Sequence, residues 1–240
     1  MISKNQIKKI QSLQQKKFRN KYELFIVEGT KSVQEFLKSS FELDSLFYTD
    51  SYPIATLSSK YQLVTNTELK KISALKKANN VLAIFKVPDF NNIKTEGLIL
   101  ALDAIKDPGN LGTIIRLGDW FGIAQIVCSK DTVDCYNPKV VQASMGSLTR
   151  VQITYTDLQN FITNTNLPVF TSLMDGDNIY KVKLPKDAII IMGNEANGIS
   201  NEILTLATNT ISIPKFGDSQ QTESLNVSTA TAIILSEFKR

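Results

Sequence analysis

The chain has 240 residues, of which 42% are hydrophobic, and its 27 Lys and Arg against 23 Asp and Glu give a net charge of +4. These values are typical of a soluble globular protein with one large core or two modest ones. No apolar run approaches the roughly 20 residues that cross a bilayer, and the first residues lack the apolar segment of a secretory signal. We therefore expect a cytoplasmic protein with no membrane segment.

Histidine is absent from the sequence, and the only cysteines are Cys128 and Cys135. The cysteines match neither a disulfide framework nor a zinc pattern, so we expect reduced thiols and no metal site. Without histidine, Ser-His-Asp and Cys-His catalysis are excluded. Any proton transfer must use a carboxylate, a lysine, a tyrosine, an activated arginine or the substrate itself.

The charge is divided unevenly along the chain. Residues 1–88 carry 15 Lys and Arg against 7 Asp and Glu, a net of +8, whereas residues 89–240 carry 12 against 16, a net of −4. A basic N-terminal part favours a module that faces nucleic acid. The alternative is a lysine-rich surface that only confers solubility.

The N-terminal part alternates between helical and extended patterns. Helices are predicted at residues 4–17 and 30–38, and strands at 24–27, 43–48, 61–65 and 81–87. This alternation predicts a small α/β domain over residues 1–88. The polar stretch that follows, with proline before it and glycine at its end, predicts a linker at residues 89–97.

Residues 98–240 alternate again and predict a second α/β domain with a parallel sheet. Ser224 is the expected N-cap of the last helix, because its hydroxyl can accept a backbone N–H of the first turn. The predicted strands are residues 98–102, 125–128, 151–154, 169–173, 188–192 and 211–213, and the predicted helices are 111–121, 137–148, 158–163, 201–207 and 224–238.

Three junctions that follow predicted strands are unusually polar: residues 107–116, 193–198 and 213–226. Ligands of open α/β sheets bind beyond the carboxyl ends of the strands, so these three segments can converge on one pocket. The alternative is three ordinary turns and a solvated Arg116. The glycine-rich motifs of dinucleotide-binding Rossmann enzymes and P-loop NTPases are absent, which argues against both classes.

The three junctions together resemble a known family. Leu102-Asp103 with residues 107–116 and 119–122 is similar to motif 1 of the SpoU (TrmH-like) RNA 2′-O-methyltransferases. Residues 192–200 are similar to motif 2, and residues 211–214 with 224–228 to motif 3. The resemblance covers residues 98–240 in the family's order. Residues 25–29 resemble part of the L30e-like RNA-binding domain that many members carry.

The resemblance implies a SPOUT fold, which is an α/β fold with a parallel sheet and a deep C-terminal trefoil knot. It also implies a homodimer with the active site near the subunit interface and S-adenosylmethionine bound in the knot. The implied cofactor-binding residues are Leu173, in the segment that helps to enclose the site, with Gly193, Ile213 and Leu225. The implied catalytic residues are Asn110, Arg116, Glu195, Ser224 and Asn226. The basic cluster expected to bind RNA is Lys8, Lys16, Lys17, Arg19 and Lys21.

Arg116 is the position on which the implied chemistry depends most. Methyl transfer is an in-line displacement that demands alignment, and the 2′-hydroxyl must also lose a proton. Arginine is a poor base at its ordinary pKa. Arg116 is therefore either a base of altered pKa or a group that orients a phosphate and stabilises the developing alkoxide. One departure from the family pattern is Lys215, where methionine is common.

The sequence thus predicts an enzyme that methylates ribose 2′-hydroxyls of structured RNA with S-adenosylmethionine, with rRNA favoured over tRNA. A catalytically inactive RNA-binding or ribosome-assembly factor that kept the fold is the alternative. An α/β enzyme unrelated to RNA is a third possibility.

Overall fold

The computed structural model describes residues 1–54, 58–89, 93, 95–217 and 224–240. They form two compact units, one of Met1–Asp89 with Asp134–Thr149 and one of Phe90–Val133 with Arg150–Arg240. Residues 134–149, which the sequence analysis placed in the second domain, pack with the N-terminal unit. Of the predicted linker at 89–97, residues 90–92 and 94 lie outside the described part of the chain.

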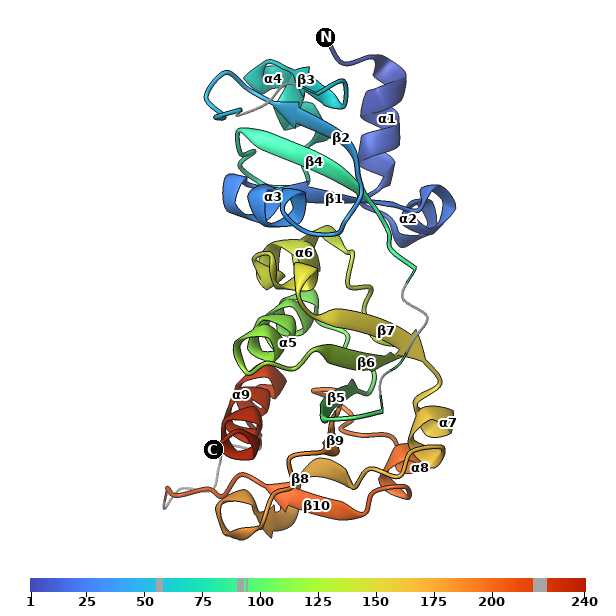
Figure 1. Cartoon of the computed structure of the whole chain (residues 1–240), viewed down its shortest axis with the longest axis vertical. Coiled ribbons are helices and arrows are strands. Elements are labelled where there is room, and N and C mark those ends of the chain that lie inside the picture. Colours follow the sequence, from blue (N-terminus) through green and yellow to red (C-terminus); the bar gives the residue numbers. More distant parts are fainter. Residues whose placement is uncertain (55–57, 90–92, 94, 218–223) are drawn as a thin grey trace. The chain divides into compact units, whose positions relative to one another are not determined.

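The first unit contains a four-stranded sheet in the order β1-β4-β2-β3 (Figure 1). β4 is antiparallel to β1 and β2, and β2 is parallel to β3. The strands are β1 (Leu24–Glu28), β2 (Leu43–Tyr48), β3 (Tyr61–Leu63) and β4 (Val81–Lys86), and the helices are α1 (Lys4–Ser12), α2 (Lys16–Tyr22), α3 (Thr30–Leu37), α4 (Asn66–Ile72) and α6 (Pro138–Ser144), with a 3₁₀ turn at Ser147–Thr149.

Alternate residues of β1 point to two different cores, as the period of a strand requires. Leu24 and Ile26 join the cluster formed with α1 and α4. Phe25 faces the other way, with its ring centroid 5.6 Å from that of Phe36 in α3 and 4.5 Å from that of Tyr136. Burial raises the pKa of the Tyr136 phenol well above its ordinary value. Residues 134–149 therefore help to close the second core of this unit.

The single helix predicted at 4–17 is in fact two helices. α1 ends at Ser12, and Gln15 adopts an extended conformation before α2 begins. The side chain of Leu13 is fully buried between them. The Leu13 carbonyl, left without a helical partner, accepts a hydrogen bond from Arg19 Nη1 at 2.8 Å. A hydrogen bond from a side chain to a carbonyl six residues earlier leaves no trace in the spacing of apolar residues, so periodicity alone missed the break.

The second unit contains a six-stranded sheet in the order β10-β8-β9-β5-β6-β7, with every neighbouring pair parallel. The parallel α/β fold predicted from the sequence is confirmed. The strands are β5 (Leu98–Leu102), β6 (Gln125–Ser129), β7 (Gln152–Thr156), β8 (Val169–Asn178), β9 (Ala188–Met192) and β10 (Asn209–Ser212), and the helices are α5 (Pro108–Trp120), α7 (Leu158–Thr163), α8 (Asn201–Leu204) and α9 (Val227–Phe238), with a 3₁₀ turn at Ile179–Lys181.

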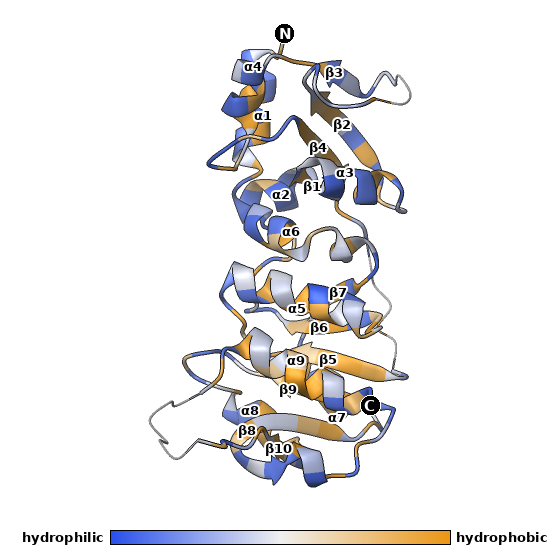
Figure 2. Ribbon diagram, turned by 90° about the vertical axis from the view of Figure 1, so that its left-hand side faces the viewer, coloured by the Kyte–Doolittle hydropathy of each residue, from blue (hydrophilic) through white to orange (hydrophobic). Residues whose placement is uncertain are grey.

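Helices cover both faces of this sheet, with α5 and α9 on one side and α7 and α8 on the other (Figure 1). All five residues of β9 are buried, as expected for a parallel strand between two helical layers. The hydrophobic residues concentrate in these central strands (Figure 2). At the α9 layer, the rings of Phe170 and Phe238 meet edge to face with centroids 5.3 Å apart. Among the described residues, no helix has the length and apolar character needed to cross a membrane.

Three of the differences from the predicted element ends bear on the site. α5 begins at Pro108 rather than 111, because the Asp107 carboxylate caps it by accepting the N–H of Asn110 at 2.8 Å. α9 begins at Val227, and its N-cap is Asn226 rather than Ser224. β8 runs on to Asn178 beyond the predicted end at 173. Residues 218–223 of the polar segment before Ser224 lie outside the described residues.

Candidate active site

The loops that follow β5 and β9 are bound to each other. These strands are neighbours in register, with Leu102 opposite Met192, so their carboxyl ends leave the sheet side by side. The Asp103 carboxylate, 7% exposed, accepts the backbone N–H and the hydroxyl of Ser200 at 2.8 and 2.7 Å. Asn194 Nδ2 donates to the Ala104 carbonyl at 2.8 Å. These bonds fix the two loops against one another.

A chain of three polar side chains then joins all three predicted junctions. Asn110 Nδ2, on the first turn of α5, donates to Glu195 Oε1 at 2.6 Å. Asn226 Nδ2 donates to Asn110 Oδ1 at 2.9 Å, while its own oxygen caps α9 by accepting the N–H of Ser228 at 2.9 Å. The predicted convergence of the three junctions is thus observed, with Asn110 as the bridge between Glu195 and Asn226.

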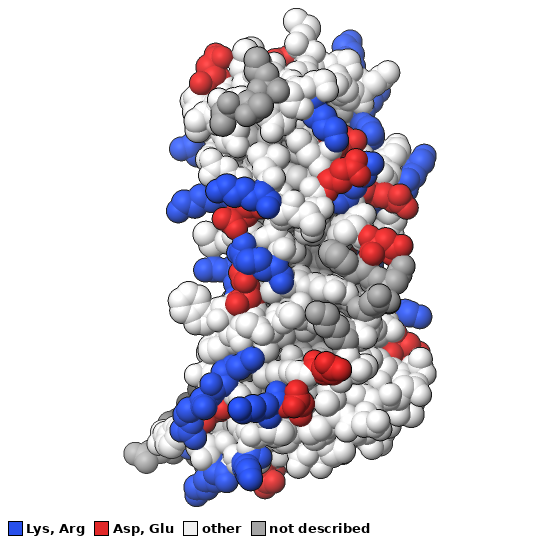
Figure 3. All heavy atoms as spheres, viewed as in Figure 1, with Lys and Arg blue, Asp and Glu red and all other residues white. Residues whose placement is uncertain are grey.

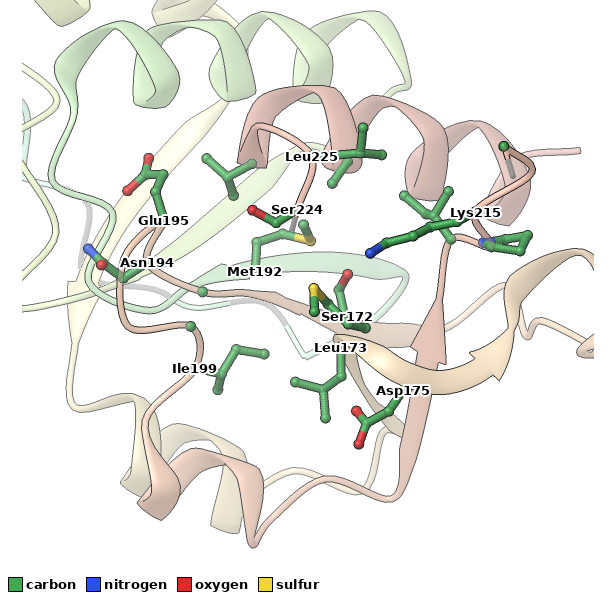
Figure 4. A pocket seen from close by; sticks show the side chains of 18 residues that line it. Ser172, Leu173, Asp175, Met192, Asn194, Glu195, Ile199, Lys215, Ser224 and Leu225 are labelled. Carbon is green, nitrogen blue, oxygen red and sulfur yellow. The ribbon is translucent and has the colours of Figure 1, made fainter. Parts of the chain in front are cut away.

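A cavity of about 1010 Å³ opens beside this chain, between the middle of β8 and the loop that follows β9 (Figure 4). Its wall contains all four residues expected to bind the cofactor. The described residues that line it are Ser172, Leu173, Met174, Asp175, Met192, Gly193, Asn194, Glu195, Gly198, Ile199, Ile213, Pro214, Lys215, Gly217, Ser224, Leu225, Val227 and Ala230.

Glycine is required at position 193. A Cβ atom there would lie 2.4 Å from the carbonyl carbon of Gly198 and 2.5 Å from the nitrogen of Ile199. The loop is closed at this point by two backbone hydrogen bonds between Asn194 and Gly198, of 2.8 and 2.9 Å. Backbone groups therefore form the cavity wall, which leaves peptide N–H and C=O groups within reach of a ligand.

The cavity combines an apolar middle with charged groups. Leu173, Met192 and Ile199 supply apolar surface, whereas Asp175 and Lys215 carry opposite charges. Figure 4 shows the Lys215 side chain reaching into the cavity. Such a site suits a ligand that has an aromatic or apolar body and both a cationic and an anionic group.

Two groups of site residues were missed by the sequence analysis. Ser172 and Asp175 line the cavity from β8, whereas the sequence analysis named only Leu173 from the segment expected to enclose the site. Asp103 and Asn194 were part of the recognised motifs but received no role. The signal that could have found them is their position directly after a buried apolar strand. Polar side chains at such positions often form the hydrogen bonds that fix a loop beside a ligand site.

Arg116 is not among the residues that line the cavity. It lies six residues after Asn110 on α5, about 9 Å along the helix axis, and its side chain is exposed. Among the described residues it has no hydrogen-bond or ion-pair partner. Ser224, by contrast, lines the cavity without capping α9. The structure thus brings four of the five predicted catalytic residues together and leaves the arginine outside.

The predicted RNA-binding residues divide into two groups. Lys8, Lys16, Lys17 and Lys21 are exposed on α1 and α2. Arg19 is only 3% exposed, and its Nε atom donates to Asp134 Oδ2 at 2.8 Å. Its guanidinium is fully engaged inside the first unit, so the prediction that Arg19 contacts RNA is wrong. Its helical neighbours gave no sign of this, because its partner lies 115 residues away.

Two known protein-family models match this sequence, one in each part of the chain. Residues 97–236 match the model of the SpoU rRNA methylase family, and residues 4–83 match the MRM3-like substrate binding domain. The chain belongs to the SpoU rRNA methylase family. The resemblance stated from the three motifs is confirmed, and the chain is that of an RNA methyltransferase.

Relatives of the SpoU family resemble the chain over nearly its whole length. It is 28% identical to the 23S rRNA (guanosine(2553)-2′-O)-methyltransferase RlmP of Bacillus subtilis, over 97% of this chain and 96% of RlmP. A TrmH-family protein from Porphyromonas gingivalis shares 37% identity, with a TM-score of 0.91 over 99% of this chain and 98% of the other. An AdoMet-bound rRNA methyltransferase from Sinorhizobium meliloti shares 27% identity, with a TM-score of 0.87 over 100% and 96%. The trefoil knot stays a prediction.

Proposed function

We propose that this protein transfers a methyl group from S-adenosylmethionine to a ribose 2′-hydroxyl of ribosomal RNA. The observation that carries the proposal is the cavity beside the Glu195–Asn110–Asn226 chain, built from the three motifs of the SpoU family. RlmP, similar over nearly the full chain, is a 23S rRNA 2′-O-methyltransferase, and the Sinorhizobium meliloti neighbour has AdoMet bound. These relatives favour rRNA over tRNA.

The residues of the cavity fit S-adenosylmethionine. Its adenine and sulfonium need apolar and backbone surroundings, which Leu173, Ile213 and Leu225 supply together with the Gly193 loop. Its amino and carboxylate groups match Asp175 and Lys215 in charge. When bound, the cofactor supplies an electrophilic methyl group on sulfur.

The protein's own residues then have to align the acceptor hydroxyl and favour its negative form. Asn110, held between Glu195 and Asn226, fixes the edge of the cavity that the ribose must approach. Arg116 is proposed to orient a phosphate of the RNA and to stabilise the developing alkoxide, because a guanidinium binds phosphate in a two-pronged geometry and stays charged. Ser224 lines the same cavity and is proposed to contact the ribose.

We propose that the protein acts as a cytoplasmic homodimer, with Arg116 of one protomer completing the cavity of the other. Arg116 is exposed and has no described partner, and Trp120, one turn further along the same helix, is 84% exposed. An exposed tryptophan beside an unpaired arginine is typical of an interface core. Residues 1–88 are proposed as the RNA-binding domain, 89–97 as the linker and 98–240 as the methyltransferase domain.

The test is methyl transfer by the purified chain. The chain is incubated with S-adenosylmethionine carrying a radioactive methyl group and with rRNA that lacks modifications, and the RNA is then hydrolysed in alkali. A 2′-O-methyl group blocks alkaline cleavage, so the label should appear in a dinucleotide. Binding of RNA without binding of the cofactor would instead support the inactive assembly factor. Cofactor binding without any affinity for RNA would support an enzyme of another class.

A further inference from the structure

One exposed surface of the first unit combines rings and lysines that the proposed chemistry does not use. It consists of Phe18 and Tyr22 on α2 with Lys9, Lys17 and Lys21, and we call it the Phe18–Tyr22 patch. The two rings lie on one face of α2, four residues apart, and are almost parallel, with an interplanar angle of 12° and centroids 6.2 Å apart. The Tyr22 side chain is 37% exposed.

Three ammonium groups surround these rings. Lys9 Nζ lies 5.4 Å from the centroid of the Tyr22 ring and Lys21 Nζ lies 5.5 Å from it, while Lys17 Nζ lies 4.9 Å from the centroid of Phe18. None of the three lysines has an ion-pair partner among the described residues.

Positive charge predominates in the sequence around the patch, and the adjacent acidic residue is Glu23, which is exposed and directly follows Tyr22. Residues 4–22 contain six lysines and no aspartate or glutamate. The single arginine of this stretch, Arg19, is buried and paired with Asp134, so it adds nothing to the surface charge. On the face of the molecule in Figure 3, acidic and basic side chains are interspersed. The α1–α2 segment is therefore a surface with free positive charge around an aromatic centre.

We infer that the Phe18–Tyr22 patch binds an unpaired nucleotide of RNA, with its base stacked on the Tyr22 ring and its flanking phosphates held by Lys9, Lys17 and Lys21. Aromatic rings beside a basic track are the usual means of holding single-stranded nucleic acid, because every base has a face that can stack. A paired base of an A-form helix cannot reach a ring, since its faces are already covered. The ligand is thus a loop, a bulge or an end of the RNA.

The contacts between lysines and rings do not block this site. A cation over an exposed ring is held weakly, whereas a base gains more by stacking and brings phosphates to which the lysines can move. This inference rests on the proposed function only in that it takes RNA as the partner. It adds to that function the kind of RNA element that the substrate must present to the N-terminal unit.

The experiment uses the full chain and an RNA hairpin that carries the fluorescent base 2-aminopurine either in its loop or in its stem. We expect the wild-type chain to quench the loop probe on binding and to leave the stem probe unchanged. Tyr22→Ala should weaken hairpin binding roughly tenfold and remove the quenching, because the stacking surface is lost. Tyr22→Phe, which keeps the ring, should behave as the wild type.

The lysines should give a different signature. Changing Lys9, Lys17 and Lys21 together to glutamine should reduce the slope of log affinity against log salt by roughly 2 to 3, since each phosphate contact releases counterions. The matched control is Lys183→Gln, an exposed lysine of the second unit, for which we expect an unchanged slope.

Three results would overturn the inference. The first is that Tyr22→Ala, folded by circular dichroism, binds and quenches as the wild type does. The second is that wild-type binding ignores the loop and depends only on the phosphates, with equal effects on loop and stem probes. The third is that the wild-type protein binds phosphatidylserine vesicles through Tyr22 but does not bind the hairpin, which would assign the patch to a membrane surface. Methylation of rRNA is scored separately: its absence alongside Tyr22-dependent quenching contradicts the proposed function and leaves the patch intact.

Discussion

Asn226 performs two tasks with the two ends of one side chain. Its oxygen caps α9, and its amide nitrogen donates to Asn110, which is bound to Glu195. The end of the terminal helix is thereby fixed to the first turn of α5 and to the loop after β9. Substitutions at Asn226 can therefore remove the bond to Asn110 with or without removing the helix cap.

We expect Asn226→Ala to lower the free energy of unfolding by about 1 kcal/mol through loss of the cap, and to slow methyl transfer. Asn226→Asp keeps a capping oxygen but loses the donor to Asn110, so it should retain most of the stability while methyl transfer stays slow. Urea unfolding and initial rates on rRNA measure the two effects. An Asn226→Asp protein as active as the wild type would show that the link to Asn110 has no catalytic use.

Arg116 is the residue whose loss should affect chemistry alone. Arg116→Ala is expected to slow methyl transfer roughly 100-fold or more, because a preorganised cationic donor near the alkoxide is removed. Cofactor affinity should not change, since Arg116 does not line the cavity. Arg116→Lys should recover little, because a lysine lacks the planar pair of donors. Calorimetry with S-adenosylmethionine and single-turnover rates test this, with Lys183→Ala as the control; a fully active Arg116→Ala protein would remove the proposed role.

At the scale of elements, α2 is tied to residues 134–149 by a buried ion pair. Arg19 donates to Asp134, and Asp134 in turn accepts the N–H of Tyr136 at 2.9 Å. Arg19→Ala or Asp134→Ala should each lower the free energy of unfolding by about 3–5 kcal/mol, because either change leaves a buried charge alone. Lys16→Ala, an exposed neighbour, should stay within about 0.5 kcal/mol of the wild type.

The double variant with Arg19→Met and Asp134→Leu distinguishes lost pairing from lost packing. It removes both charges and keeps apolar volume, so it should be markedly more stable than either alanine variant. Denaturant unfolding of the four proteins measures this. If the single variants had the same free energy of unfolding as the wild type, the ion pair between Arg19 and Asp134 would have no role in stability.

The sequence was a good guide to which elements exist and a poor guide to their ends. The apolar strands β5 and β9 were predicted residue for residue, because burial on both faces leaves a continuous apolar run. The caps Asp107 and Asn226 were missed, since several polar residues in each segment can cap and only the fold selects one. The convergence of Asn110, Glu195 and Asn226 followed from their places after predicted strands of one parallel sheet, whereas the bridging role of Asn110 depends on side-chain directions that no pattern contains.

At the scale of the whole molecule, the proposed dimer predicts that two inactive chains can complement each other. Arg116→Ala leaves the cavity intact, and Leu225→Trp, which fills part of the cavity with an indole ring and so blocks the cofactor, leaves Arg116 intact. If Arg116 acts across the interface, the mixed dimer has one complete site. Equal mixing followed by subunit exchange should then restore about a quarter of the wild-type activity, because half of the dimers are mixed. A mixture as inactive as its components would place Arg116 in the site of its own chain.

The central claim is that this chain methylates a ribose of ribosomal RNA. The most direct measurement compares ribose methylation in total rRNA and tRNA from cells with and without the gene, by nuclease digestion and mass spectrometry. We expect one 2′-O-methyl nucleotide to disappear from rRNA, and we expect the wild-type gene, but not the Arg116→Ala gene, to restore it. Identical nucleotide profiles in the presence and absence of the gene would contradict the account and favour an RNA-binding factor without catalytic activity.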